Sequence, residues 1–144
     1  MTAWVPSEID HVGIAVRDLD GAVEHYRRTL GIEPVHRETV EDQGVEEVLF
    51  RVGASYVQLL AATGPDTPVG KFLANRGPGM HHVALRVDDI GAALQRAADA
   101  GAELIDATPR VGLFGLQVAF IHPHSIEGVL VELVQPTNEG IEHG

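Results

Sequence analysis

The spacing of apolar residues predicts the same pair of elements twice in this chain, a strand followed by a helix. The segments Ile9–Val16 and Met80–Val87 are either wholly apolar or alternate between apolar and polar residues, a pattern typical of strands. An aspartate suited to cap the N-terminus of a helix follows each segment, Asp18 in the first case and Asp89 in the second. We therefore predict two strand–helix pairs.

Apolar residues at helical spacing follow both aspartates. They are Leu19, Ala22, Val23, Tyr26 and Leu30 in the first helix, and Ile90, Ala93, Leu94 and Ala97 in the second. A glycine then ends each predicted helix, Gly31 and Gly101 respectively.

Three short strands are predicted after each helix. They are Pro34–Val40, Glu46–Val52 and Ser55–Ala61, and then Leu104–Ala107, Leu116–His122 and Val129–Val134. Between the two sets, residues 63–78 are rich in Gly and Pro, with a short helix-compatible segment, PVGKFLANR, in their middle. These residues are predicted to be a linker.

The two halves are also similar in sequence. HVGIAVRDLDGAV, which begins at His11, aligns with HVALRVDDIGAAL, which begins 71 residues later at His82. YVQLLAAT aligns with LVELVQPT, 74 residues later, and this alignment places Gln58 opposite Glu132. The chain therefore reads as a duplication.

The predicted fold class is α+β, with two repeated βαβββ modules. We expect a single domain over residues 8–136, with module one at 8–62, the linker at 63–78 and module two at 79–136.

The repeat turns four polar side chains on apolar strands into a candidate metal site. If the halves pack about a pseudo-twofold axis, His11 approaches its copy His82. Gln58 then approaches Glu132 in the same way. A single strand histidine is more often hydrogen-bonded or exposed than a ligand, but four metal-capable side chains repeated in register favour a ligand set. Two imidazoles, a carboxylate and an amide oxygen suit an octahedral Co, Ni, Mn, Fe or Zn ion.

Composition narrows the remaining classes of function. The chain has no cysteine, which excludes disulfides, thiolate catalysis and thiolate metal ligands. Its formal net charge is −11, and no segment gathers basic residues into a stripe, so nucleic acid is not an expected partner. No apolar run is long enough to cross a bilayer, and the start lacks a signal-peptide pattern, so we expect a soluble, cytoplasmic protein that does not bind membranes.

Five motifs of the chain are DHVGIAV, EDQGVEEV, VQLL, GPGMHHVALRVDDI and HPHSIEGVLVEL. They resemble those of the methylmalonyl-CoA epimerase family, within the vicinal oxygen chelate superfamily (the glyoxalase, bleomycin resistance and dioxygenase proteins). The resemblance extends from about Ile9 to Pro136. One departure is His124, where relatives commonly carry Lys. The resemblance implies that the paired βαβββ modules form a cupped mixed sheet around a metal site (the vicinal oxygen chelate fold). It also implies a homodimer, and interconversion of the (R) and (S) forms of methylmalonyl-CoA, a small acyl-CoA substrate.

The resemblance also assigns roles to particular residues. It implies that the four repeated side chains are metal ligands, with Co²⁺ preferred over Ni, Mn, Zn or Fe. It further implies that Glu47 is the catalytic base that removes the α-proton, while the metal stabilises the enolate. Because inversion requires a proton to return on the opposite face, Glu132 or a bound water is the candidate second acid.

Two alternatives remain open at this stage. The first is another metal enzyme of the same fold, either a lactoylglutathione lyase-like isomerase or an extradiol dioxygenase. Gln58 disfavours both. In addition, the lyases usually carry a carboxylate at its position, and the dioxygenases usually have a longer chain. The second is a metal-free small-molecule binding protein, which the four intact ligands disfavour.

Overall fold

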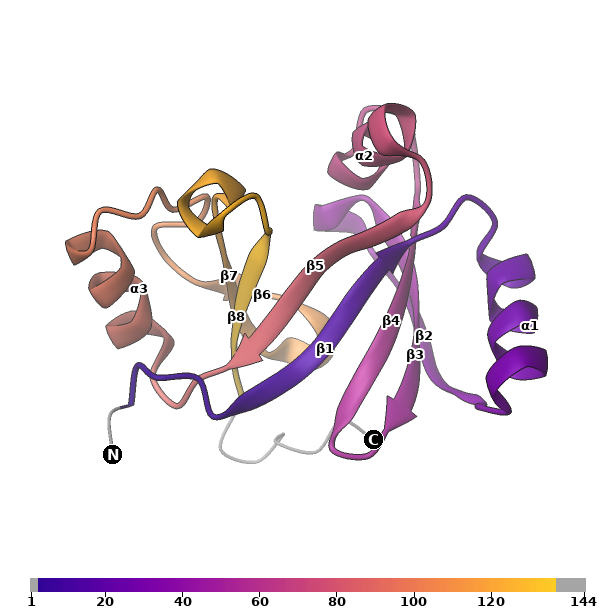
Figure 1. Ribbon diagram of the computed structural model, residues 1–144, viewed down its shortest axis with the longest axis horizontal. Coiled ribbons are helices and arrows are strands. Elements are labelled where there is room, and N and C mark those ends of the chain that lie inside the picture. The colour runs from indigo at the N-terminus through magenta and orange to yellow at the C-terminus, as the bar shows by residue number, and fades with distance from the viewer. Residues whose placement is uncertain (1–2, 137–144) are drawn as a thin grey trace. The chain divides into compact units, whose positions relative to one another are not determined.

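The structure is a computed structural model that describes residues 3–136 of the 144-residue chain. Its strands are β1 (Glu8–Ala15), β2 (Pro34–Val40), β3 (Val45–Val52), β4 (Ser55–Ala62), β5 (Gly79–Arg86), β6 (Arg110–Val111), β7 (Gln117–Ile121) and β8 (Val131–Gln135). Its α-helices are α1 (Leu19–Leu30), α2 (Pro68–Arg76) and α3 (Ile90–Asp99), and three short 3-10 turns are η1 (Glu41–Gln43), η2 (Leu113–Gly115) and η3 (Pro123–Ile126) (Figure 1). No helix in the described part of the chain is both long and apolar enough to span a membrane.

The chain divides into two compact units. We call His11–His81 the N-terminal unit, and we call the described residues up to Asp10, together with those from His82 onward, the C-terminal unit. The boundary cuts through β1 and β5, so each unit contains a part of both strands.

Helices α1 and α3 begin as the sequence predicts. The side chain of Asp18 accepts a hydrogen bond from the backbone N–H of Gly21, and Asp89 accepts one from Ala92. Each bond satisfies an amide that has no partner within its own helix. At the other end of α1, Gly31 adopts a left-handed conformation with φ of 71°, which glycine reaches without steric cost.

In the N-terminal unit, one face of the sheet packs against α1. The other face packs against α2 through a small apolar core and also carries polar side chains. The strand order is β2-β3-β4-β1, with β3 antiparallel and β1 parallel to β4. Val48, Phe50 and Leu59 form the core beneath α1. Because neighbouring residues point to opposite faces, Glu47 and Gln58 lie on the face away from α1.

The C-terminal unit has the same two-sided arrangement. The strand order is β5-β8-β7-β6, and α3 covers one face (Figure 1). The core under α3 consists of Val87, Ile90, Ala93, Leu94, Ala119, Ile121, Val131 and Leu133. The alternate residues of the same strands, His82 on β5 and Glu132 on β8, therefore lie on the face away from α3.

The predicted strand Leu104–Ala107 is wrong. Leu104 forms only an isolated bridge with Ile121, and the strand that pairs with β7 in this part of the chain is β6. The ladder stops because the backbone N–H groups of Ile105 and Asp106 both donate to the Phe120 carbonyl. In return, the Asp106 carboxylate accepts the N–H of Phe120, so a side chain takes the place of a backbone acceptor.

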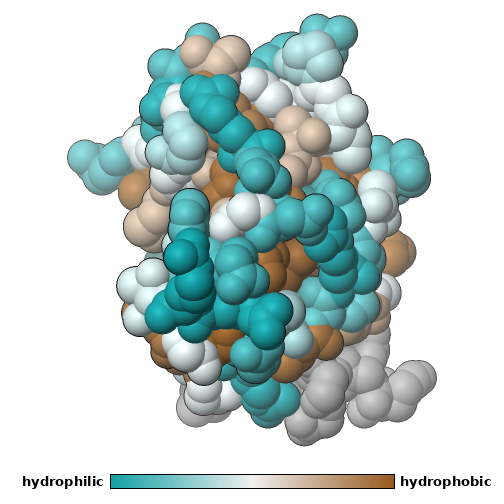
Figure 2. Space-filling view, turned by 90° about the vertical axis from the view of Figure 1, so that its right-hand side faces the viewer, coloured by the Kyte–Doolittle hydropathy of each residue, from teal (hydrophilic) through white to brown (hydrophobic). Residues whose placement is uncertain are grey.

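The α1 side of the N-terminal unit is largely hydrophilic, with smaller hydrophobic areas between the polar side chains (Figure 2). On this unit Arg37 bonds to both Asp20 and Glu46. Both hydrogen bonds raise the pKa of the Arg37 guanidinium, and the bond to Glu46 has the larger effect. All three side chains are substantially exposed, so each ion pair contributes less than about 1 kcal/mol to stability.

A buried ion pair joins the start of β1 to the end of β5 in the C-terminal unit. Asp10 is only 1% exposed, and its Oδ1 accepts bonds from Nε and a terminal nitrogen of Arg86, at 3.1 and 2.6 Å. Arg86 also bonds to Glu8, an exposed residue, at 2.8 Å.

Replacing Asp10 by Ala is expected to lower the free energy of unfolding by about 3–5 kcal/mol, because it leaves a largely buried guanidinium without its closest partner. Chemical denaturation measures the change. Glu8→Ala is the matched control and should cost less than about 1 kcal/mol, because Glu8 is solvent-accessible. Equal losses in the two variants would contradict the assignment of the stability to the buried pair.

Candidate metal centre

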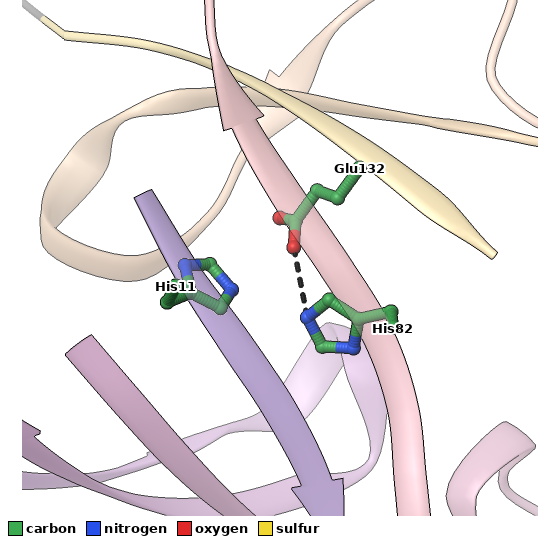
Figure 3. A group of neighbouring side chains, drawn as sticks. All are labelled: His11, His82 and Glu132. Carbon is green, nitrogen blue, oxygen red and sulfur yellow. Dashed lines mark ion pairs between the residues drawn. The ribbon is translucent and has the colours of Figure 1, made fainter. Parts of the chain in front are cut away.

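His82 and Glu132 form a close buried pair in the C-terminal unit. β5 and β8 are parallel neighbours, and Ala84 lies opposite Glu132, so His82 is one alternate residue away on the same face. His82 Nε2 is 3.1 Å from the Oε1 atom of Glu132, the contact marked by the dashed line in Figure 3. An imidazole nitrogen and a carboxylate oxygen pointing at each other in a buried place are suited to share a cation.

Phe120 forms the wall beside this pair. It lies directly opposite Glu132 in the antiparallel pairing of β7 and β8. Its ring meets the His82 ring edge-on, with 5.8 Å between the ring centroids. An aromatic ring packed on the imidazole restricts its rotation and keeps water from one side of it.

Gln58 and Glu47 form a second buried pair in the N-terminal unit. Nε2 of Gln58 donates a hydrogen bond of 2.5 Å to the Oε1 atom of Glu47, and both residues are almost completely buried. Among residues 3–136, no hydrogen-bond donor reaches the carbonyl oxygen of Gln58. A buried acceptor without a hydrogen bond lowers the free energy of unfolding by about 1–3 kcal/mol unless another group, such as an ion, satisfies it. A cation satisfies an amide oxygen, so Gln58 fits the role of a metal ligand.

His11 lies on β1, on the same face of the N-terminal sheet as Gln58. In the parallel pairing of β1 and β4, Gly13 is opposite Gln58 and His11 is opposite Tyr56. His11 is buried, and Figure 3 draws it together with His82 and Glu132. Each of these three side chains carries a nitrogen or oxygen atom of the kind that can bind a metal ion.

The structure thus brings the predicted residues together within each unit, His82 with Glu132 and Gln58 with Glu47. Sequence analysis missed the hydrogen bond between Glu47 and Gln58 and the contact between Phe120 and His82. The strand register could have indicated Phe120, because the residue opposite Glu132 on the neighbouring strand lies on the same face of the sheet as Glu132. No sequence pattern indicated that the two polar residues of the N-terminal unit bond to each other.

A second group of potential ligands, Glu103, His122 and His124, lies at the surface of the C-terminal unit. Nε2 of His124 is 3.0 Å from a Glu103 carboxylate oxygen. Nδ1 of His122 accepts the backbone N–H of His124 and caps η3. These contacts give the group a role in holding the turn, and its members are more exposed than the buried ligands.

A comparison with protein families identifies the superfamily of this chain. The family described as the glyoxalase/bleomycin resistance protein/dioxygenase superfamily matches residues 10–120. The chain belongs to this superfamily. The match includes His11, Glu47, Gln58 and His82, whereas Glu132 lies beyond its end.

Several relatives extend the similarity over nearly the whole chain. The ethylmalonyl-CoA/methylmalonyl-CoA epimerase of Cereibacter sphaeroides is 38% identical over 129 residues, which cover 88% of this chain and 96% of the relative. The human mitochondrial methylmalonyl-CoA epimerase is 34% identical over 135 residues, which cover 93% of this chain and 77% of the relative.

Solved structures of similar proteins agree with the predicted fold. A single-substitution variant of Streptomyces coelicolor methylmalonyl-CoA epimerase in complex with 2-nitronate-propionyl-CoA is 42% identical, with a TM-score of 0.90 over 93% of this chain and 97% of that one. The Mycobacterium tuberculosis methylmalonyl-CoA epimerase is 40% identical, with a TM-score of 0.90 over 96% and 94% of the two chains. The predicted vicinal oxygen chelate fold is therefore confirmed.

Proposed function

We propose that this chain is an isomerase that interconverts the (R) and (S) forms of methylmalonyl-CoA by removing and returning the α-proton. The observation that carries the proposal is the 2.5 Å hydrogen bond between Gln58 and Glu47. It ties a buried carboxylate, able to accept a proton, to an amide whose oxygen is suited to hold a cation. The similarity to methylmalonyl-CoA epimerases is the reason for proposing methylmalonyl-CoA as the substrate.

In this proposal one divalent ion is held by His11, Gln58, His82 and Glu132. Two imidazoles, an amide oxygen and a carboxylate match the preferences of Co²⁺, our preferred ion, and also those of Ni, Mn, Zn and Fe. When bound, the ion supplies a Lewis acid that stabilises the negative charge of the enolate.

Glu47 is the proposed base. Its carboxylate accepts the α-proton, so that the C–H bond breaks, an O–H bond forms and the electron pair remains on the substrate as the enolate. Because one of its oxygens already accepts the Gln58 N–H, the carboxylate is held in a fixed orientation. Gln58 thus has two roles, one through its nitrogen and one through its oxygen.

Glu132 is the proposed second proton carrier. Inversion requires that the proton return on the face opposite to that from which Glu47 removed it. In this step the O–H bond of protonated Glu132 breaks and its proton moves to the α-carbon on that face, which yields the other epimer. Proton exchange with water then returns Glu47 to a carboxylate and Glu132 to an acid. The two carboxylates exchange roles according to the epimer bound.

The alternative functions are a lactoylglutathione lyase-like isomerase and a metal-free binding protein. The deciding experiment treats the purified protein with methylmalonyl-CoA and, separately, with the hemithioacetal of methylglyoxal and glutathione, and measures the metal content by elemental analysis. We expect about one divalent ion per chain and conversion of methylmalonyl-CoA alone. Conversion of the hemithioacetal alone would establish the lyase, and binding without an ion or turnover would establish the binding protein.

Three further predictions accompany this proposal. They are that the protein forms a homodimer, that it works in the cytoplasm, and that the modules divide at 8–62, 63–78 and 79–136. The high identity with epimerases across both halves of the chain favours a single functional domain.

A further inference from the structure

An acidic chain that acts on an acyl-CoA has to attract an anion. The formal net charge of −11 opposes the approach of a negatively charged substrate, and a cationic side chain near the site, in addition to the proposed metal ion, offsets part of this repulsion. At least four arginines of the described residues are already engaged by carboxylates. Arg27 and Arg28 both pair with Glu24. Arg86 bonds to Asp10 and Glu8, and Arg37 bonds to Asp20 and Glu46.

Arg110 lies on the sheet face that carries the metal ligands of the C-terminal unit. It is paired with Val118 on β7, and Val118 is paired with Val134 on β8. Residues opposite each other share a face, and so do alternate residues of one strand. Arg110 therefore projects on the same face as Phe120 and Glu132, and α3 packs on the other face.

The Arg110 side chain reaches toward the metal ligands across Phe120. Its guanidinium carbon is 5.7 Å from the centroid of the Phe120 ring, whose neighbour is the His82 ring. Asp106 holds the arrangement together, because its carboxylate accepts the Phe120 N–H at 2.9 Å and lies 3.6 Å from Nε of Arg110.

Most of the donors of Arg110 remain available. Its one ion pair within residues 3–136 is the long contact from Nε to Asp106, so the two terminal nitrogens have no carboxylate partner there. The side chain is 41% exposed, which leaves it open to a ligand. A guanidinium that presents its two terminal nitrogens side by side suits bidentate binding of a carboxylate or a phosphate.

We propose that Arg110 binds an anionic group of the acyl-CoA substrate and thereby raises its affinity, an inference that rests on the proposed function. The anion is either the carboxylate of the malonyl group or a phosphate of the CoA moiety. Arg110 is a substrate-binding residue in this proposal, and Glu47 and Glu132 keep the proton transfers.

The test compares wild type, Arg110→Gln, Arg110→Lys and Arg96→Gln. Arg96 is a matched control, because its guanidinium also lies over an aromatic ring, that of Trp4 at 4.6 Å, but on α3, away from the ligand face. We expect KM for methylmalonyl-CoA to rise about 10- to 100-fold in Arg110→Gln, with a smaller rise in Arg110→Lys, because a hydrogen bond to a charged group is lost or weakened. In both Arg110 variants, kcat should stay within about threefold of wild type. In Arg96→Gln, KM should stay within the same limit, which is smaller than the change in KM expected from the loss of one hydrogen bond to a charged group.

Truncated ligands distinguish the two sources of the anion. Methylmalonyl-pantetheine lacks the phosphates, and propionyl-CoA lacks the carboxylate; calorimetry measures their binding to wild type and Arg110→Gln. A loss of affinity that disappears with methylmalonyl-pantetheine assigns a phosphate, whereas one that disappears with propionyl-CoA assigns the carboxylate.

The inference is overturned if Arg110→Gln binds methylmalonyl-CoA as tightly as wild type does. It is equally overturned if wild type binds no acyl-CoA. Wild type that binds methylmalonyl-CoA without converting it would instead refute the proposed function, and the comparison of binding by the two proteins would still decide the role of Arg110.

Discussion

Replacing Glu47 by Gln should lower kcat for methylmalonyl-CoA by about 10²–10⁴-fold, the usual contribution of a general base. The amide is close to the carboxylate in shape, and its carbonyl oxygen still accepts the hydrogen bond that Gln58 donates. The metal ligands are therefore expected to keep their places. Steady-state kinetics measures the loss, and elemental analysis checks that the variant holds as much metal as wild type does.

The neighbouring Glu46 provides the matched control. It lies on the same strand but points to the other face, where it bonds to Arg37. Glu46→Gln is expected to keep kcat within about threefold of wild type, since a surface pair has little influence on the site. If both variants retain activity, the base has been misidentified; if Glu47→Gln also loses its metal, the loss of activity no longer identifies a proton acceptor.

Replacing His82 by Ala should remove the metal and the activity together. Even the outer hydrogen-bond partners of metal ligands contribute roughly 10–100-fold in metal affinity, so loss of a ligand is expected to cost more than about 100-fold. The experiment titrates Co²⁺ into the metal-free variant and measures conversion at saturating substrate. The thermal unfolding of the metal-free proteins shows whether the fold is retained.

His81, the residue before His82, is the control for this experiment. It contacts the ring of Phe72, with 5.0 Å between the centroids, and alternation along β5 turns it away from the ligand face. His81→Ala should therefore bind Co²⁺ like wild type. Retention of full metal affinity in His82→Ala would remove His82 from the ligand set.

Local rules and the internal repeat predicted much of this structure from the sequence. Asp18 and Asp89 mark the starts of α1 and α3 because the residues after them carry an apolar stripe at helical spacing. The repeat then singled out His82 and Glu132, which the structure brings within 3.1 Å. The spacing of residues alone did not distinguish a candidate ligand from an ordinary buried polar residue. The internal duplication did, because it repeated the metal-capable side chains at equivalent positions.

What the sequence did not predict depends on contacts between residues far apart in the chain. The strand expected at Leu104–Ala107 is interrupted because Asp106 bonds to the Phe120 backbone, and no local pattern specifies that partner. The buried pair of Asp10 and Arg86 joins residues 76 positions apart. Such pairings follow from strand register, which becomes readable only when the sheet is known.

The orientation of the Gln58 amide is the clearest example of information held by packing. From the sequence, Gln58 is a polar residue on an apolar strand that aligns with a glutamate in the other half. In the structure, its nitrogen bonds to Glu47, and its oxygen receives no hydrogen bond from the part of the chain that the structure describes. This one side chain connects the proposed base to the proposed metal, and it explains why an amide serves here where a carboxylate would repel Glu47.

Exchange of the α-proton of methylmalonyl-CoA in deuterated water, followed by NMR, tests the central claim most directly. With metal-loaded protein, the α-proton signal is expected to disappear; with protein stripped by a chelator it should persist, and added Co²⁺ should restore the exchange. Persistence of the signal with protein shown to hold one ion per chain would contradict the proposed epimerase, and exchange unaffected by the chelator would contradict its dependence on metal.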